Sequence, residues 1–206
     1  MSIHMLSKIR NVRYRGLVAA TLLRWLSKLG IKIVPYNLYV ESNEYLDKAN
    51  FMERFNKTCK VKIMNADDLD VFVAQENCPE LKNKFLGLWG QGSSCLCVIS
   101  GGRVIAYAWF DLDHCQYDYW SFNLQNGEAY AFNFWTSKRA RWVAMFLAAA
   151  VYVHLRSQGR QTIYSVTETF NTPAMNLRRK LHSKFCRRFV YVKIFSLFEN
   201  NLEIRR

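Results

Sequence analysis

From residue 61 onward, the alternation of apolar and polar segments predicts a definite order of strands and helices. A strand and two helices are followed by three strands, and then by a helix, a strand, a helix and a closing strand pair or single strand. The expected strands are 61–64, 95–100, 103–112, 128–135, 161–167 and 189–197, and the expected helices are 67–75, 79–88, 141–157 and one beginning at Thr172-Pro173. With a short strand at 37–40, this order predicts an α/β fold with a mixed sheet of about six to seven strands, flanked by helices.

Turn residues support these boundaries. Gly101 and Gly102 join two apolar runs, and a two-residue Gly-Gly connection is typical of a β-hairpin. Pro173 stands in the first helical turn, where a missing N–H costs nothing. Residues 116–118 are expected to lie in a polar loop before the aromatic strand 128–135.

The N-terminal region is basic and amphipathic. Its first 34 residues contain seven lysines and arginines and no acidic residue. Val18, Leu22, Trp25, Leu26 and Leu29 recur at helical spacing, and Gly30 suits the end of that helix. We expect a basic helical extension over residues 1–58 and an α/β domain over residues 59–206. The apolar stripe predicts packing on the domain, contact with an anionic membrane, or partner binding.

The formal net charge of +13 indicates an anionic partner. A coenzyme phosphate, an acidic substrate, a carrier protein, nucleic acid and an anionic membrane all have suitable charge. The chain shows no RNA-binding signature, which disfavours nucleic acid. Half of the residues are apolar and 15% are aromatic, so a sizeable core is expected and general disorder is disfavoured.

The six cysteines contain no CxxC pair, and the four histidines are dispersed. Reduced thiols in a cytosolic protein, with no metal site, are the expected reading. The longest apolar run, residues 142–153, is shorter than the roughly 20 residues needed to span a bilayer. We therefore expect a cytoplasmic protein, with peripheral membrane association as the alternative.

A basic loop joins the strand 129–135 to the apolar helix 141–157. Its sequence is Thr136-Ser137-Lys138-Arg139-Ala140-Arg141. The start of a helix presents unpaired backbone N–H groups and the positive end of the helix dipole, which together bind phosphate. Lys138, Arg139 and Arg141 would add charge-assisted contacts. A solvated basic turn is the alternative interpretation of this segment.

The same stretch resembles the acyl-CoA-binding motif of the GNAT superfamily of acyltransferases. That motif, Arg/Gln-x-x-Gly-x-Gly/Ala at the start of a helix, aligns with residues 139–144. Asn171 and Ala174 resemble the family's Asn-x-x-Ala segment, and residues 105–107 resemble its Gly-x-x-(Val/Ile)-(Gly/Ala)-(Tyr/Phe) strand. The resemblance covers residues 61–198, about two-thirds of the chain, and rests on the order of several individually loose motifs.

The resemblance implies acetyl-CoA or another acyl-CoA as co-substrate, with no metal. The implied coenzyme-binding residues are Phe134, Trp135, Thr136, Lys138, Arg139, Ala140, Arg141, Trp142, Val143, Ala144, Asn171, Ala174 and Arg178. Four residues, at three places, depart from the family pattern. Trp142 replaces a glycine beside the pyrophosphate, Arg178 replaces a tyrosine that acts as general acid, and His182-Ser183 replaces a Gly-Phe pair.

The implied reaction is direct attack of a primary amine on the thioester. Backbone groups of the strand 129–135 would hold the pantetheine, and a backbone N–H near Phe134 or Trp135 would polarise the thioester carbonyl. Glu128, or else Glu168, would accept the proton of the amine, although either can be a solvated strand-end charge. Asn133 would orient the substrate or a water, or make a structural hydrogen bond.

Other possibilities stay open at this point. The donor can be an acyl carrier protein or a long-chain acyl group used at a membrane surface, since carrier proteins are acidic. The altered motif also fits a non-catalytic, degenerate GNAT-like domain. The acceptor is expected to be a small-molecule or peptide amine, and neither its identity nor the oligomeric state follows from the sequence.

Overall fold

The computed structural model describes residues 15–41, 59–195 and 197–204, with the side chains of residues 15–20 left out. The helices are α2 (Arg15–Lys28), α4 (Ala66–Glu76), α5 (Glu80–Gly90), the 3₁₀ helix η1 (Arg141–Val143), α6 (Ala144–Ser157) and α7 (Thr172–Lys180). The strands are β1 (Ile31–Val40), β2 (Lys60–Ile63), β3 (Ser94–Ser100), β4 (Arg103–Asp111), β5 (His114–Tyr117), β6 (Trp120–Asn123), β7 (Glu128–Thr136), β8 (Thr162–Glu168), β9 (Lys184–Ile194) and β10 (Phe198–Ile204).

The hydrogen-bonded strand order is β10-β9-β1-β8-β7-β4-β3-β2. This eight-stranded mixed sheet confirms the predicted fold class. The sheet is larger than the expected six to seven strands, because residues 198–204, beyond the predicted closing segment 189–197, form a further strand, β10. The short strand expected at 37–40 is also longer, since β1 begins at Ile31.

The described residues form two compact units. The terminal unit consists of residues 15–38, 167–176, 186–195 and 197–204, and the central unit consists of 39–41, 59–166 and 177–185. Strands β1, β8 and β9 and helix α7 therefore contribute residues to both. The division expected between residues 58 and 59 stays a prediction, because neither of these units follows a single sequence boundary.

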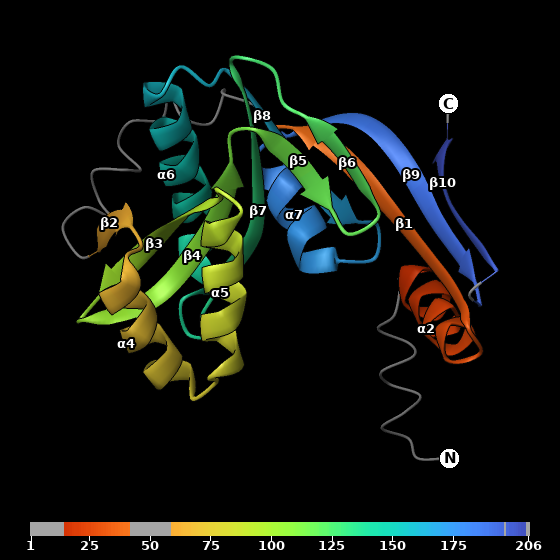
Figure 1. The fold of residues 1–206 in the computed structure, drawn as a ribbon, viewed down its shortest axis with the longest axis horizontal. Helices are drawn as coiled ribbons and strands as arrows, with labels where there is room; N and C mark the ends of the chain where they lie inside the picture. Colours follow the sequence, from red (N-terminus) through yellow and green to blue (C-terminus); the bar gives the residue numbers. More distant parts are fainter. Residues whose placement is uncertain (1–14, 42–58, 196, 205–206) are drawn as a thin grey trace. The chain divides into compact units, whose positions relative to one another are not determined.

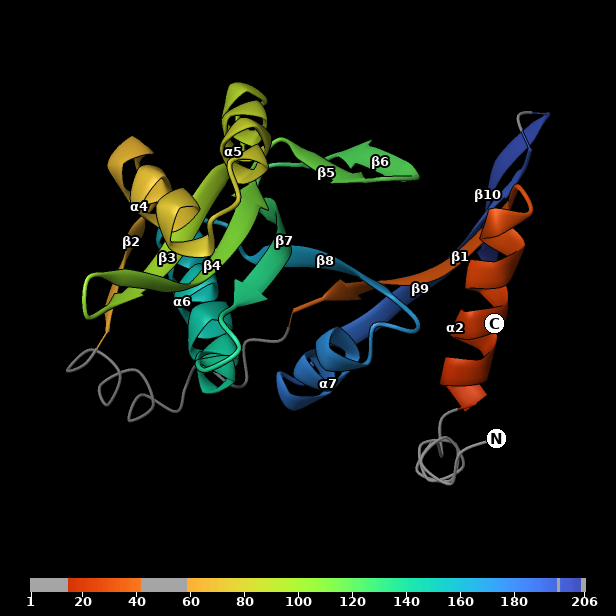
Figure 2. The same ribbon diagram turned by 90° about the horizontal axis from the view of Figure 1, so that it is seen from below.

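In the central unit, helices cover both faces of the sheet (Figures 1 and 2). Helix α6 lies on one face, and α4 and α5 lie on the other. The α6 side buries Phe146 and Leu147, and the α4–α5 side buries Phe72 and Trp109. Burial of each such side chain contributes about 1.5–3 kcal/mol, so these two cores hold the sheet in place.

Local signals account for the ends of several elements. Asn65 and Asp68 form a reciprocal capping box at the start of α4, with hydrogen bonds of 3.0 and 3.1 Å. Gly101 and Gly102 both have positive φ, at 56° and 72°, which is the requirement of a tight hairpin turn between β3 and β4. The predicted hairpin is thereby confirmed.

The polar loop expected around residues 116–118 is wrong. Gln116 and Tyr117 end β5 and Asp118 lies in the turn that follows; β5 pairs antiparallel with β6 through Cys115 and Phe122. Cys115 is fully buried, and Phe122 lies edge-on to Tyr164 at 5.4 Å. The burial of Cys115 and the contact between Phe122 and Tyr164 stabilise the hairpin, and neither can be inferred from the polar composition of the segment.

In the terminal unit, α2 ends at Lys28 and Gly30 follows with φ of 83°. The helix predicted from apolar spacing is confirmed. Leu22, Trp25 and Leu29 are nevertheless exposed, and Leu26 is half-buried; the side chain of Val18 lies outside the described residues. No helix in the described part of the chain is long and apolar enough to cross a membrane.

Candidate functional site

Strand β7 contains a bulge at Asn133. Phe132 pairs with Trp109 of β4 and Trp135 pairs with Tyr107, so Asn133 and Phe134 together oppose one residue. Asn133 has φ of 48°, a left-handed conformation that asparagine adopts more readily than most residues. A bulge of this kind bends the strand and withdraws backbone groups from the ladder.

Strand β8 departs from β7 ahead of the bulge. The two parallel strands pair at Glu128, Ala129 and Tyr130, and no later pair joins them in the described chain. The edge of β7 from Ala131 onward therefore lacks strand partners on the β8 side. Unpaired backbone groups of this kind can bind an extended, amide-containing ligand such as a pantetheine arm.

The basic loop follows directly after the bulged strand. Ser137 N donates to Ile105 O at 2.9 Å, and Ala140 N donates to Ser137 O at 3.0 Å, which fixes a tight turn. Ala140 is buried, whereas Lys138 and Arg139 are exposed. Neither exposed cation forms an ion pair with another described residue, so both are available to an anion.

The helix after the loop begins with a turn of 3₁₀ helix. Within η1, Val143 is fully buried and anchors the turn, whereas Arg141 and Trp142 face outward. Trp142 is 53% exposed, so its indole ring does not fill the core behind the loop. Ala144, the last residue of the predicted motif, begins α6. The predicted phosphate-binding sequence therefore lies at the start of a helix, as expected.

The side chains beside the bulge point to opposite faces of the sheet. Trp135 stacks on Tyr107 at 5.3 Å and lies edge-on to Phe72 at 5.1 Å, within the α4–α5 core. Phe134 packs on the α6 side, and the guanidinium of Arg178 lies 5.2 Å from its ring centroid. Packing on both faces restricts the backbone between these residues.

Arg178, expected near the coenzyme, is held in a buried network. Its guanidinium pairs with Glu41 and lies 3.4 Å from the hydroxyl of Tyr152. Glu41 also accepts hydrogen bonds from Ser165 and Ser183. Burial is the largest influence on the pKa of Arg178 and lowers it, but Glu41, Tyr152 and Tyr130 together outweigh burial and the pKa is raised. Sequence reasoning missed Glu41, which no motif marks.

Glu128, the first candidate base, lies at the beginning of β7. Its carboxylate accepts hydrogen bonds from Tyr164 Oη at 2.9 Å and from the backbone N of Gln125 at 2.8 Å. Six residues separate it from Phe134, which is about 20 Å along an extended strand. The structure therefore places Glu128 where β7 and β8 are still paired, and at the other end of the strand from the basic loop.

The remaining predicted residues belong to the terminal unit. Glu168 and Asn171 line a cavity of about 350 Å³ together with Arg24 and Lys32. Asn171 Oδ1 accepts a hydrogen bond from Ala174 N at 3.3 Å, in the first turn of α7. Asn171 therefore has a local role in capping α7 as well as a place in this cavity.

The six cysteines of the chain are free thiols, most of them buried. None of the six cysteines, all of which are described, forms a disulfide. Burial raises the pKa of Cys97 to about 12 and raises the pKa values of Cys95 and Cys115 as well, so these thiols are protonated. No cluster of metal-binding side chains occurs within the described residues.

Comparison with known proteins identifies the fold. The sequence matches no protein-family model and no curated protein. A GNAT-family acetyltransferase from Colwellia psychrerythraea superposes with a TM-score of 0.52 at 19% identity, over 80% of this chain and 57% of that one. A fungal GCN5-related glucosamine N-acetyltransferase region gives 0.58 at 13% identity, over 84% and 22%. A GCN5-related N-acetyltransferase-like protein from Streptococcus suis gives 0.51 at 13% identity, over 84% and 66%.

These similarities define the class of fold. The chain has the GNAT fold, as the resemblance of its motifs predicted. It spans less than two thirds of each of these solved chains. At such identities the likeness concerns the fold, and the activity has to be argued from the residues of this chain.

Proposed function

We propose that this protein is an N-acyltransferase that transfers an acyl group, acetyl in the simplest case, from acyl-CoA to a primary amine. The observation that carries the proposal is the bulge at Asn133, at a free edge of β7 and directly before the basic loop. The free edge suits the amide groups of pantetheine. The loop, which begins a helix, suits the phosphates of the coenzyme.

The reaction would proceed within this arrangement by direct transfer. The amine nitrogen attacks the thioester carbon, and the thiolate of the coenzyme leaves as the amide bond forms. A backbone N–H beside the bulge, at Phe134 or Trp135, would stabilise the negative charge on the carbonyl oxygen. Because Trp135 and Phe134 are packed on opposite faces, this N–H is held in place before the substrate arrives.

The amine must lose a proton for the transfer to occur. Glu128 retains a role as base only if the acceptor extends along β7, because its carboxylate lies at the start of that strand. Glu168 is the second candidate and shares a cavity with Arg24 and Lys32. The variants Glu128→Gln and Glu168→Gln, assayed at a pH below the pKa of the amine, should distinguish the two candidates. The variant that lacks the base should turn over about 10²–10⁴-fold more slowly than the parent.

Coenzyme binding is the direct test of the donor site. We expect acetyl-CoA to bind in calorimetry, and the doubly substituted Arg139→Ala/Arg141→Ala protein to bind at least tenfold more weakly, with a larger loss at low salt. Lys84→Ala, which removes an exposed cation from α5, is the matched control and should bind normally. Equal affinity in all three proteins would refute the placement of the phosphates.

The choice of donor is tested in the same assay. A long-chain acyl-CoA is compared with acetyl-CoA, and an acyl carrier protein is used if neither binds. Binding of the carrier protein alone would support the alternative donor, for which the net charge of +13 is suitable. If the protein binds neither acetyl-CoA, nor the long-chain acyl-CoA, nor the acyl carrier protein, the result would support a GNAT-like domain without catalytic activity.

A further inference from the structure

Exposed apolar side chains gather on two segments of the terminal unit. Helix α2 contributes Leu22 and Trp25, and the turn directly after it contributes Leu29; these side chains are 59–65% exposed. The turn between β9 and β10 contributes Phe195 and Leu197, and the start of β10 contributes Phe198. Leu197 is 88% exposed, the highest of these values. We call these six residues the apolar end surface.

The two segments lie against each other although more than 160 residues separate them in sequence. Phe195 N donates a hydrogen bond to Gly30 O at 2.6 Å. A Cβ at Gly30 would stand 2.6 Å from Cδ1 of Phe195, so only glycine permits this approach. The end of α2 and the β9–β10 turn are therefore one continuous region of the terminal unit, visible in both views (Figures 1 and 2).

The apolar side chains of α2 occupy one face. Positions 22, 25 and 29 fall within about 60° of one another at 100° per residue. Leu23, by contrast, lines the cavity inside the unit. Scattered exposed apolar residues are common, but six on two adjoining segments, with tryptophan and phenylalanine among them, form the kind of patch that marks an interaction site.

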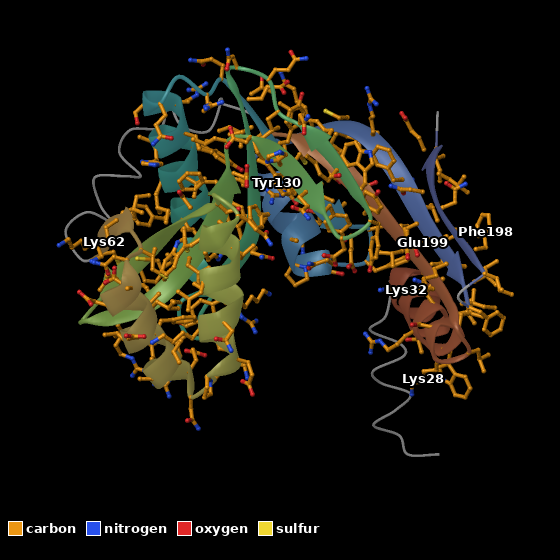
Figure 3. All side chains as sticks on the ribbon, viewed as in Figure 1. Lys28, Lys32, Lys62, Tyr130, Phe198 and Glu199 are labelled. Atoms are coloured by element: carbon orange, nitrogen blue, oxygen red, sulfur yellow. The ribbon has the colours of Figure 1, made fainter. Side chains whose placement is uncertain are left out.

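The sequence beside this surface is basic. Residues 15–38 contain Arg15, Arg24, Lys28 and Lys32 and no acidic residue. In Figure 3, Lys28 is labelled at the end of α2 and Lys32 between Lys28 and Glu199, and Phe198 and Glu199 are labelled on β10. Glu199 pairs with Lys193 at 2.9 Å, and the hydrogen bond from Lys193 lowers the pKa of Glu199. The local excess of charge is therefore positive.

We propose that the terminal unit docks on an anionic lipid bilayer through the apolar end surface. Trp25, Leu29 and Leu197 would enter the boundary between headgroups and acyl chains, while Lys28 and Lys32 would contact anionic headgroups. A symmetric dimer through this surface would bring each cluster of lysines and arginines close to its own copy. The charge complementarity therefore favours a membrane over a second copy of the chain.

This inference goes beyond the proposed acyl transfer and does not depend on it. It is tested with the full chain and extruded vesicles of phosphatidylcholine, with and without 30 mol% phosphatidylserine, by co-sedimentation at about 0.1 M salt. We expect binding to the anionic vesicles and weak binding to the neutral ones. Lys28→Gln should weaken binding roughly fivefold, the effect of one basic residue at an anionic surface.

The apolar contribution has its own variants. Trp25→Ala/Leu197→Ala should weaken binding to anionic vesicles by about tenfold or more, because both side chains leave the bilayer boundary. Leu86→Ala, which shortens a 46% exposed side chain on α5, is the matched control and should bind like the parent. Circular dichroism of each variant checks that the fold is retained.

Two results would overturn the proposal. One is vesicle binding that is equally strong for the parent and for Trp25→Ala/Leu197→Ala, or a parent protein that binds neither type of vesicle. The other is a dimer in analytical ultracentrifugation that Trp25→Ala/Leu197→Ala dissociates, which would assign the surface to self-association. Loss of vesicle binding with normal binding of acetyl-CoA would support the proposal independently of the acyltransferase reaction.

Discussion

Replacement of Glu41 by glutamine removes the charge that balances Arg178 inside the central unit. The two side chains are 0% and 6% exposed, so the remaining guanidinium would stay buried without a counter-ion. Loss of one partner of a buried ion pair costs about 3–5 kcal/mol. That loss is a large part of the 5–15 kcal/mol typical of a domain, so Glu41→Gln should unfold at much lower denaturant concentration.

The measurement is urea unfolding followed by far-UV circular dichroism. With an m-value of about 2 kcal/mol per M, a loss of 3–5 kcal/mol lowers the midpoint by about 1.5–2.5 M. Asp70→Asn is the control, because Asp70 pairs with Lys82 at 2.6 Å on the surface and both side chains are about half exposed. Such a surface pair contributes at most about 1 kcal/mol.

The double variant Glu41→Gln/Arg178→Met tests the cause. With both charges removed, no buried ion is left unpaired, so part of the lost stability should return. A shift in midpoint below about 0.5 M for Glu41→Gln would refute the reasoning. The reasoning would also be refuted if the double variant lost as much stability as Glu41→Gln and Arg178→Met lose in sum, because the two charges would then not be coupled.

Two further predictions concern the bulge and the thiols. Asn133→Gly should keep the left-handed backbone and retain acetyl-CoA binding, whereas Asn133→Val should cost roughly 1–3 kcal/mol and weaken binding; equal melting temperatures for the two would contradict this. Burial raises the pKa of Cys97 to about 12, so the native thiol stays protonated where the unfolded thiol ionises, near pH 8.5. The unfolded state then binds fewer protons, and the free energy of unfolding should fall as pH rises from about 8.5 toward 10. Cys97→Ala should flatten this slope in urea titrations at several pH values, and an unchanged slope would contradict the assignment.

Much of the candidate site could be anticipated from local sequence. The loop at Lys138 and Arg139 was predicted to begin a helix after an aromatic strand, and the structure places it there. The bulge could not be predicted, because the left-handed conformation of Asn133 depends on how β7 pairs with β4. Glu41 could not be predicted either, since it contacts Arg178 across 137 residues of sequence.

The sequence by itself determined the order of most elements, the Gly101-Gly102 hairpin, the helix of the N-terminal region and the position of the basic loop. These features depend on side-chain periodicity and turn chemistry within a few neighbouring residues. Only the tertiary structure decided that β1 lies between β9 and β8, that β5 pairs with β6, and that Arg178 is buried against Glu41. It also decided that Trp25 and Leu29 stay exposed. Such outcomes depend on partners brought together from distant parts of the chain, whose identity no local pattern contains.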